Sequence, residues 1–331
     1  MSAVPISILD LALVGRGEAV RDALEGCVTL ARRAEELGYE RVWYAEHHNM
    51  TTIASSATAV LIAHVAAHTD HIRLGSGGIM LPNHAPLTIA EQFGTLATLH
   101  PGRIDLGLGR APGTDQVTFR ALRRTIDAAH AFPDDVLELQ GYLGDESRVP
   151  GVTATPGQGT HVPLYILGSS LFGAQLAAAL GLPYAFASHF APQALEQAVA
   201  NYRREFRPSA QLAAPYVIAG LNVIAAETDD DAAEQLQATR RSRVRLLFGR
   251  GGRRFSDHEA DQVLASPQGA AVEEMMRYTA AGTPDEVRDQ LHRFATHADA
   301  DEVIVAHQCP TLPQRLRSLE LLAEAAIAVP S

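Results

Sequence analysis

Side chains that could carry out chemistry lie in six short segments, each containing histidine, arginine, serine or glycine. The segments are Glu46-His47-His48, Ser76-Gly77-Gly78, Gly109-Arg110, Gly168-Ser169-Ser170, Ser188-His189 and Ala306-His307. Because a histidine side chain titrates near pH 6.5 (about one unit either way), His47 is suited to act as a general base or hydrogen-bond donor at neutral pH. The alternative for His47 is a structural role under a loop.

The segment Gly168 to Gly173 leads from a predicted strand into a predicted helix. Backbone N–H groups at a helix start, the hydroxyls of Ser169 and Ser170 and the positive end of the helix dipole favour a phosphate. Arg110 could supply a cation to the same phosphate. The alternatives are a helix-capping role for Ser169 and a salt bridge at the rim for Arg110.

Two glycine-containing segments could also bind a cofactor. The adjacent glycines Gly77 and Gly78 either admit a flat ring against the backbone or form a tight turn. The glycines of Gly107-x-Gly109-x-x-x-Gly113 are spaced one residue too widely for a dinucleotide fingerprint, so no Rossmann domain is predicted.

A metal cluster of Glu46, His189 and His307 is an alternative, but residues 6–13 lack the histidine pair with which metal barrels commonly begin. We predict no metal.

The elements that must position these residues alternate between short β-rich runs and longer helical patterns, which is typical of βα units. The expected strands are residues 6–13, 41–46, 72–77, 104–109, 164–167, 184–188, 216–225 and 302–306. The expected helices are 20–37, 55–68, 87–99, 134–142, 174–180, 193–206, 229–247 and 316–326, with another announced by the capping box Thr283 to Glu286.

Eight such units without a linker predict a single α/β domain over residues 1–331, a (β/α)8 TIM barrel. It carries an insertion after strand four, residues 115–159, and a mobile loop after strand seven, where residues 249–256 are rich in glycine and arginine. In such barrels the active site is built by the loops that follow the strands. All six chemical segments fall at these positions, so we expect them to share one face.

Composition restricts the partners of the chain. Its 331 residues include 27 Lys and Arg against 38 Asp and Glu, a net charge of −11, which argues against nucleic acid and anionic lipid as partners. Cys27 and Cys309 lack a C-x-x-C spacing, so reduced thiols are favoured over a disulfide. No signal-like start and no 18-residue apolar run are present, which predicts a cytoplasmic protein that does not span a membrane.

Four ordered motifs resemble the bacterial luciferase-like flavin-dependent monooxygenases, nearest to the single-chain "group 1" luciferase-like oxidoreductases. The likeness covers nearly the whole chain. The motifs are Glu46-His47-His48 after Ala-Glu-Glu-Leu-Gly-Tyr-Glu-Arg-Val-Trp-Tyr44, Gly75-Ser-Gly-Gly-Ile-Met-Leu-Pro-Asn-His84, Pro101-Gly-Arg-Ile-Asp-Leu-Gly-Leu-Gly-Arg-Ala-Pro-Gly-Thr-Asp115 and Ile166-Leu-Gly-Ser-Ser170.

The resemblance implies that reduced FMN binds at the carboxyl ends of the strands. Its phosphate would lie near Arg110, Gly168, Ser169 and Ser170, and its ring against Ser76, Gly77 and Gly78, where the family often has a non-proline cis peptide. His47 matches the family's catalytic histidine, proposed to aid formation or use of the flavin C4a-hydroperoxide. Residues 249–268 match a mobile loop that closes over the site and excludes water.

The implied activity is that of a two-component monooxygenase. A separate flavin reductase supplies reduced FMN in trans, O2 reacts to a C4a-peroxyflavin, and a small organic substrate is oxidised; a homodimer is also implied. The alternatives are an F420-dependent hydride-transfer oxidoreductase and a flavin-binding protein without turnover. Gly109 stands where light-emitting subunits carry a reactive cysteine, so bioluminescence is not implied. No motif names the organic substrate.

Overall fold

A closed ring of parallel strands forms the centre of the protein. The computed structural model describes residues 4–15, 17–111, 114–249 and 254–327. Its sheet has nine strands in the order β6-β5-β4-β3-β2-β1-β9-β7-β8, and pairing of β6 with β7 closes the ring. The strands are β1 Ile6–Asp10, β2 Arg41–Tyr44, β3 Arg73–Met80, β4 Ile104–Gly109, β5 Leu164–Gly168, β6 Tyr184–Phe186, β7 Val217–Ala225, β8 Thr279–Gly282 and β9 Glu302–His307.

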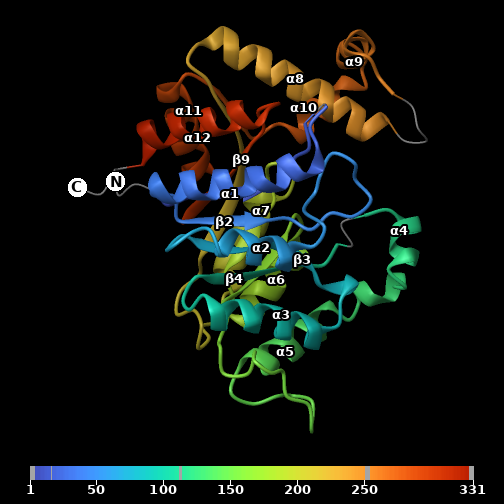
Figure 1. Ribbon diagram of the computed structural model, residues 1–331, viewed down its shortest axis with the longest axis vertical. Helices are drawn as coiled ribbons and strands as arrows, with labels where there is room; N and C mark the ends of the chain where they lie inside the picture. The colour runs from blue at the N-terminus through green and yellow to red at the C-terminus, as the bar shows by residue number, and fades with distance from the viewer. Residues whose placement is uncertain (1–3, 16, 112–113, 250–253, 328–331) are drawn as a thin grey trace.

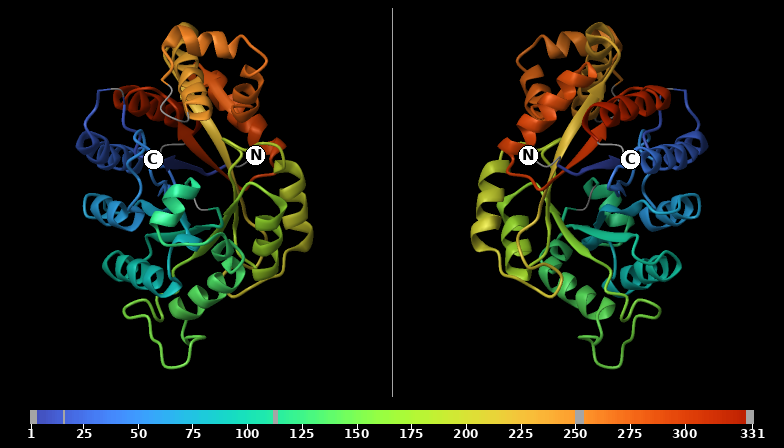
Figure 2. Two further views of the ribbon diagram at one scale, coloured as in Figure 1. Left: turned by 90° about the vertical axis from the view of Figure 1, so that its right-hand side faces the viewer. Right: turned by 90° about the vertical axis from the view of Figure 1, so that its left-hand side faces the viewer.

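Helices surround this ring, as both views of Figure 2 show. They are α1 Val20–Glu36, α2 Thr58–Ala66, α3 Pro86–Leu99, α4 Gln116–Ala121, α5 Phe132–Leu143, α6 Leu171–Leu180, α7 Leu195–Glu205, α8 Asp229–Phe248, α9 Asp257–Leu264, α10 Gly269–Met275, α11 Pro284–His297 and α12 Leu312–Ala326. Two short 3-10 helices, Leu81–Asn83 and Ile126–Ala129, complete the elements. The barrel of eight parallel strands with flanking helices confirms the predicted (β/α)8 class.

The interior of the ring changes character from one end to the other. Because strand side chains alternate between faces, every second residue of a strand points inward. Arg41, Asp105 and Glu302 are buried at or next to the starts of their strands, and Arg41 donates hydrogen bonds to both carboxylates. Above them an apolar layer fills the ring: Leu9, Trp43, Tyr165, Ala185, Ile218 and Ile304. Trp43 and Tyr165 meet edge to face, 4.9 Å between centroids.

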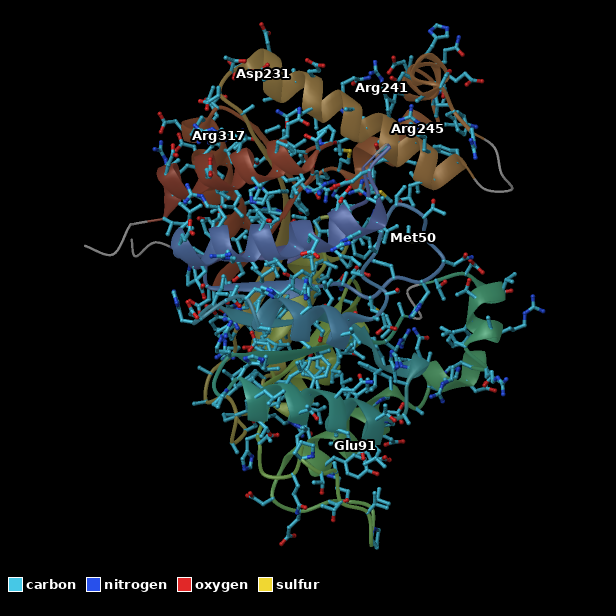
Figure 3. All side chains as sticks on the ribbon, viewed as in Figure 1. Met50, Glu91, Asp231, Arg241, Arg245 and Arg317 are labelled. Atoms are coloured by element: carbon cyan, nitrogen blue, oxygen red, sulfur yellow. The ribbon has the colours of Figure 1, made fainter. Side chains whose placement is uncertain are left out.

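The carboxyl ends of the strands lie on one side of the molecule. Met50, in the loop after β2, and helix α4, after β4, are both on the right in Figures 1 and 3. The left view of Figure 2 therefore looks onto this end of the barrel. Helices α8, α9 and α10 cover one edge of it, at the top of that view.

Element boundaries differ from expectation at several points. Strand β3 continues to Met80, because a register shift between Ser76 and Ile79 lets it keep pairing with β4. Strand β6 ends at Phe186, and the last helix begins at Leu312, where Thr311 and Gln314 form a capping box. The capping box at Thr283 and Glu286 forms as predicted.

Strand β8 and helices α4, α9 and α10 were not predicted from the sequence. Strand β8 lies outside the ring and pairs with residues 222–225 of β7; its short sequence Thr-Ala-Ala-Gly carries no β-branched run. Helix α9 occupies Asp257–Leu264, inside the segment expected to be a loop. Cys27 and Cys309 are both free and buried, as expected. In the described part of the chain, no helix is both long and apolar enough to span a membrane.

Candidate active site

Small residues open the barrel at the carboxyl ends of its strands. A side chain at Gly77 would meet Leu9 Cδ1 at 2.7 Å, and one at Gly107 would meet the carbonyl oxygen of Ser76 at 2.2 Å. A side chain at Gly220 would lie 2.4 Å from Nδ1 of His189. Glycine is therefore required at these positions by close approach of neighbouring atoms. The consequence is a mouth where backbone, rather than bulky side chains, lines the ends of β3 and β4.

The end of β3 is built of backbone groups. The peptide bond between Gly77 and Gly78 is cis, at the place where the family resemblance implied one. The Ser76 hydroxyl is buried and donates to the carbonyl oxygen of Gly107 at 2.8 Å, so it faces β4 rather than the mouth. Gly77 is partly exposed. A flat ligand at this end of the barrel would therefore contact peptide groups.

Arg110 lies beside the start of helix α6. Its guanidinium carbon stacks over the ring of Phe172, 4.2 Å from the ring centroid. Phe172 belongs to the first turn of α6, directly after Gly168, Ser169 and Ser170. The structure thus brings together two predicted parts of the phosphate site that are about sixty positions apart in the chain. No described carboxylate lies within ion-pair distance of Arg110, which argues against the rim salt bridge.

The two serines before α6 are not used by the fold. Ser170, rather than Ser169, is the N-cap residue of α6, and its side chain makes no capping hydrogen bond. Both serines are exposed, and neither hydroxyl bonds to another described residue. Only the carbonyl oxygen of Ser170 is engaged, by the Tyr184 hydroxyl at 3.1 Å. The N–H groups of the first helical turn and two hydroxyls therefore remain for an anion.

Glu46, which follows β2, forms a buried hub that the sequence did not reveal. Its carboxylate accepts hydrogen bonds from Nε2 of His48 at 2.9 Å, Nε2 of His84 at 2.9 Å, the amide of Asn83 at 3.0 Å and the backbone N–H of Met80 at 3.0 Å. Burial opposes ionisation of Glu46, but these bonds outweigh it and lower its pKa to about 2. The same contact raises the pKa of His48.

This hub separates the roles of the two adjacent histidines. His48 is held by Glu46, whereas His47 is partly exposed and its backbone N–H donates to the carbonyl oxygen of Ser55 at 3.1 Å. His47 is also close enough to His189 for its positive charge to lower the pKa of that residue. These two histidines follow β2 and β6, which lie on opposite sides of the ring.

His189 and His307 do not join Glu46 in a metal cluster. His189 packs against Gly220, and its pKa falls to about 3, first through burial and then through the charges of Arg243 and His47. His307 bonds through Nδ1 to the Ser318 hydroxyl at 2.9 Å, and burial lowers its pKa to about 3. Across the described residues, no group of three His, Cys, Asp or Glu side chains is arranged to hold a metal.

Most of the described part of residues 249–268 is packed rather than loose. Helix α9 is joined to α8 by the Arg241–Asp261 pair at 2.7 Å. Phe255 is buried in a small cluster with Val244, Ala260, Val272 and Met276. Residues 250–253, the centre of the expected mobile loop, lie outside the described residues. The movement expected of this loop stays a prediction.

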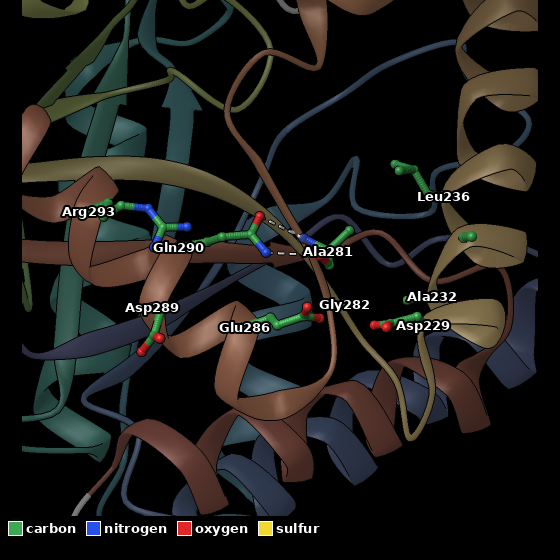
Figure 4. A pocket seen from close by; sticks show the side chains of 10 residues that line it. Asp229, Ala232, Leu236, Ala281, Gly282, Glu286, Asp289, Gln290 and Arg293 are labelled. Atoms are coloured by element: carbon green, nitrogen blue, oxygen red, sulfur yellow. Dashed lines mark hydrogen bonds between the residues drawn. The ribbon is translucent and has the colours of Figure 1, made fainter.

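A surface pocket of about 430 Å³ lies away from the mouth, between the start of α8 and helix α11. Figure 4 shows Asp229 and Glu286 on its walls, with Gln290 bonded to the backbone of Ala281. The hydrogen bond that protonated Asp229 donates to Glu286 and the negative charge of Glu286 raise the pKa of Asp229. None of the predicted site residues lines this pocket, so it does not belong to the candidate active site.

The fold defines a (β/α)8 barrel with small and polar residues at the carboxyl ends of its strands. A model of the luciferase-like monooxygenase family matches residues 6–300, and the chain belongs to this family. A luciferase-like monooxygenase of Escherichia coli (strain K12) is 47% identical over 320 residues, 96% of each chain. The N-acetyl-S-alkylcysteine monooxygenase of Bacillus subtilis (strain 168) is 33% identical over 98% of this chain and 99% of its own.

Solved structures agree with this assignment. The crystal structure of apo-MsnO8 matches with a TM-score of 0.89 and 37% identity, covering 99% of this chain and 100% of that one. More distant barrels share the fold alone. They include the oxygenating constituent of 3,6-diketocamphane monooxygenase in complex with FMN, at 17% identity, and a coenzyme F420-dependent tetrahydromethanopterin reductase, at 19%. The chain is thus an oxidoreductase of a family whose structural neighbours use FMN or F420.

Proposed function

We propose that the protein is a two-component flavin-dependent monooxygenase that uses reduced FMN and O2 to oxidise a small organic substrate. The observation that carries the proposal is the placement of Arg110, without a described acidic partner, beside the unused hydroxyls of Ser169 and Ser170 at the start of α6. A phosphate monoester fits this combination of guanidinium, hydroxyls and helix N–H groups. FMN ends in such a group.

The remaining part of the mouth suits a flat ring. Ser76, Gly77 and Gly78 would present their backbone to the flavin, since neither glycine places a side chain there. Gly168 would allow the phosphate to approach the chain closely. When bound and reduced, the flavin supplies the electrons that activate O2. The protein's own contribution is to orient the ring, to exclude water and to hold a proton at the reacting position.

His47 is the residue we assign to that proton. It stands at the mouth and is partly exposed. The pKa of about 3 keeps His189 neutral at physiological pH, so His47 is the better candidate for exchanging a proton there. Residues 249–268 would cover the site during the reaction. We further propose a flavin reductase in trans, a homodimer and a cytoplasmic location, as the family resemblance implies.

The alternative proposal is an F420-dependent hydride-transfer oxidoreductase, favoured by the F420-dependent enzyme among the structural neighbours. Anaerobic titration with reduced FMN and with reduced F420 separates the two. We expect reduced FMN to bind at least tenfold more tightly. Tighter binding of F420, or binding of neither, would contradict the FMN assignment. A flavin-binding protein without turnover would bind FMN but would form no oxygenated product.

Replacing His47 by Asn tests the proton role. We expect the variant to bind FMN as the wild type does. Its yield of oxygenated product should fall by about a hundredfold or more, the lower limit of the usual 10²–10⁴-fold contribution of general acid–base catalysis. The first probe substrate is N-acetyl-S-methylcysteine, from the compound class for which one relative is named. His64→Asn, on the outer surface of α2, is the control. Unchanged product yield in His47→Asn would discard the assignment.

A further inference from the structure

Arg243 differs from the neighbouring arginines of helix α8. Arg240 pairs with Glu273 at 2.9 Å, Arg241 pairs with Asp261 at 2.7 Å, and Arg245 pairs with Asp257. Among the described residues, no carboxylate lies within 4.0 Å of Arg243. Its hydrogen bond runs from Nη2 to the amide oxygen of Gln308, at 2.8 Å. One guanidinium of the helix is therefore left with a neutral partner.

Arg243 lies at the mouth of the barrel. Gln308 directly follows β9, and its carbonyl oxygen accepts a hydrogen bond of 2.6 Å from Thr239, which fixes α8 over this strand end. His189 follows β6 and feels the charges of both Arg243 and His47. Arg243 and Gln308 thus lie together over the end of β9, and His189 is near enough to Arg243 to feel its charge.

The environment of Arg243 removes water without supplying an anion. The surrounding protein desolvates its guanidinium, which lowers its pKa, although arginine remains protonated in proteins. A cation that is partly withdrawn from water and lacks a counter-charge destabilises the fold. A bound anion would offset that cost through charge-assisted hydrogen bonds. The three paired arginines on the same helix show that the chain can supply carboxylates where it uses arginine structurally.

The anion is not the flavin phosphate. That group has its own cation in Arg110, which follows β4, and in the ring β4 lies opposite β9. Two guanidinium groups without described acidic partners on opposite sides of one mouth indicate two anionic groups. One belongs to the cofactor, and the other must come from a second ligand.

We propose that Arg243 and Gln308 form a subsite for a carboxylate carried by the organic substrate, with His189 against the adjoining part of that molecule. This assignment rests on the proposed function in two respects: it takes Arg110 as the cation for the flavin phosphate, and the mouth as the place where the substrate reacts. The substrate class is a small organic acid, bound with its carboxylate toward β9 and its reacting group toward the flavin side of the mouth.

Binding of benzoate and benzamide tests the proposal, since the two probes share a shape and differ in charge. Calorimetry on the full chain, with and without FMN and without turnover, gives both dissociation constants. We expect the wild type to bind benzoate at least tenfold more tightly than benzamide. Arg243→Gln should abolish this preference and Arg243→Lys should keep part of it. The control variant Arg241→Gln, two positions earlier on α8, should keep the whole preference.

Three results would overturn the proposal. The first is a wild-type chain without preference for benzoate, and the second is a preference that survives in Arg243→Gln. The third is a tenfold loss of FMN affinity in Arg243→Gln while the preference remains, which would assign Arg243 to the flavin. Because no turnover is measured, failure of the monooxygenase assignment would appear in the flavin titration and leave this comparison intact.

Discussion

The two ends of the barrel treat charge in opposite ways. At the amino end, Arg41 bonds to both Asp105 and Glu302, and Arg73 pairs with Asp105, so one buried and one partly buried cation meet two buried carboxylates. At the carboxyl end, Arg110 and Arg243 have no described carboxylate partner. The first arrangement is complete within the chain and serves the fold. The second is incomplete, and we infer that ligands complete it.

Neutral groups reinforce the same difference. At the amino end the Tyr165 hydroxyl accepts from Arg41 at 3.0 Å, and the Tyr216 hydroxyl donates to Glu302 at 2.7 Å, so neutral groups add further bonds to the ion pairs. At the carboxyl end the hydroxyls of Ser169 and Ser170 stay unused. A network in which every polar group is satisfied rigidifies a core, whereas an unsatisfied one leaves room for binding.

The largest expected effect comes from breaking the complete end. Arg41→Met removes the cation shared by Asp105 and Glu302 and leaves both carboxylates buried without it. We expect the free energy of unfolding to fall by about 3–5 kcal/mol, the usual result of removing one partner of a buried ion pair. Urea denaturation measures the change. Arg33→Gln is the control, because its partly exposed pairs with Glu36 and Glu320 should contribute about 1 kcal/mol or less. Equal losses in both variants would contradict the contrast.

The second prediction concerns Glu46, a carboxylate at the carboxyl end that accepts hydrogen bonds from four groups of the chain. With a folded pKa of about 2 against an ordinary value of 4.5, Glu46 contributes stability above pH 4.5, which is lost as the pH falls toward 2. His48, whose pKa is raised from 6.5, contributes below pH 6.5 and loses this contribution as the pH rises through its folded pKa. Both contributions are therefore present between these limits.

Glu46→Gln should accordingly destabilise the protein by about 3 kcal/mol, the value that this pKa difference represents. The gap between wild type and variant should be widest between pH 4.5 and 6.5 and should narrow at lower pH. Urea denaturation across the pH range measures it. A gap that does not depend on pH would mean that Glu46 acts through packing alone. A double variant with His48→Gln separates the contribution of that contact.

How well the sequence predicts each end of the barrel depends on how far apart along the chain the interacting residues lie. The barrel is predictable because its signal is local: alternation of strand and helix patterns along the chain. The candidate residues at the mouth are predictable because each lies in or shortly after the carboxyl-terminal part of a strand, and strand ends of a parallel barrel converge. Strand β8 was missed because Thr279–Gly282 is short, has only one β-branched residue and pairs at the outside. Helix α9 was missed because the glycine-rich stretch before it hid its capping box.

The contacts that distinguish the two ends are not local. Arg41 and Glu302 are 261 positions apart, and Glu46 and His84 are 38 apart. One signal was available for the amino end: Arg41, Arg73, Asp105 and Glu302 each stand at or next to the first residue of a strand. Charged residues at that recurring position indicate a polar layer inside the ring. Nothing comparable in the sequence distinguishes Arg243 from the other arginines of α8.

The third prediction tests whether Arg110, at the carboxyl end, contributes to ligand binding rather than to stability. Arg110→Ala should change the free energy of unfolding by less than about 0.5 kcal/mol, as for a surface position without an ion pair. FMN binding should weaken by about 2 kcal/mol, the usual contribution of a charged hydrogen bond. Riboflavin, which lacks the phosphate, is the control and should bind both proteins equally. Equal affinity of the wild type for FMN and riboflavin would remove the phosphate assignment.

The smallest expected effect compares two helix starts. Thr311 caps α12 with its side chain, whereas Ser170, the N-cap of α6, makes no such bond. Thr311→Ala should therefore lower the free energy of unfolding by about 1 kcal/mol, and Ser170→Ala by only a few tenths. FMN binding should respond in the opposite order, with about 1 kcal/mol lost in Ser170→Ala and none in Thr311→Ala. If Ser170→Ala cost stability and left FMN affinity unchanged, that serine would be a structural cap, and the contrast between the two ends of the barrel would lose its support at α6.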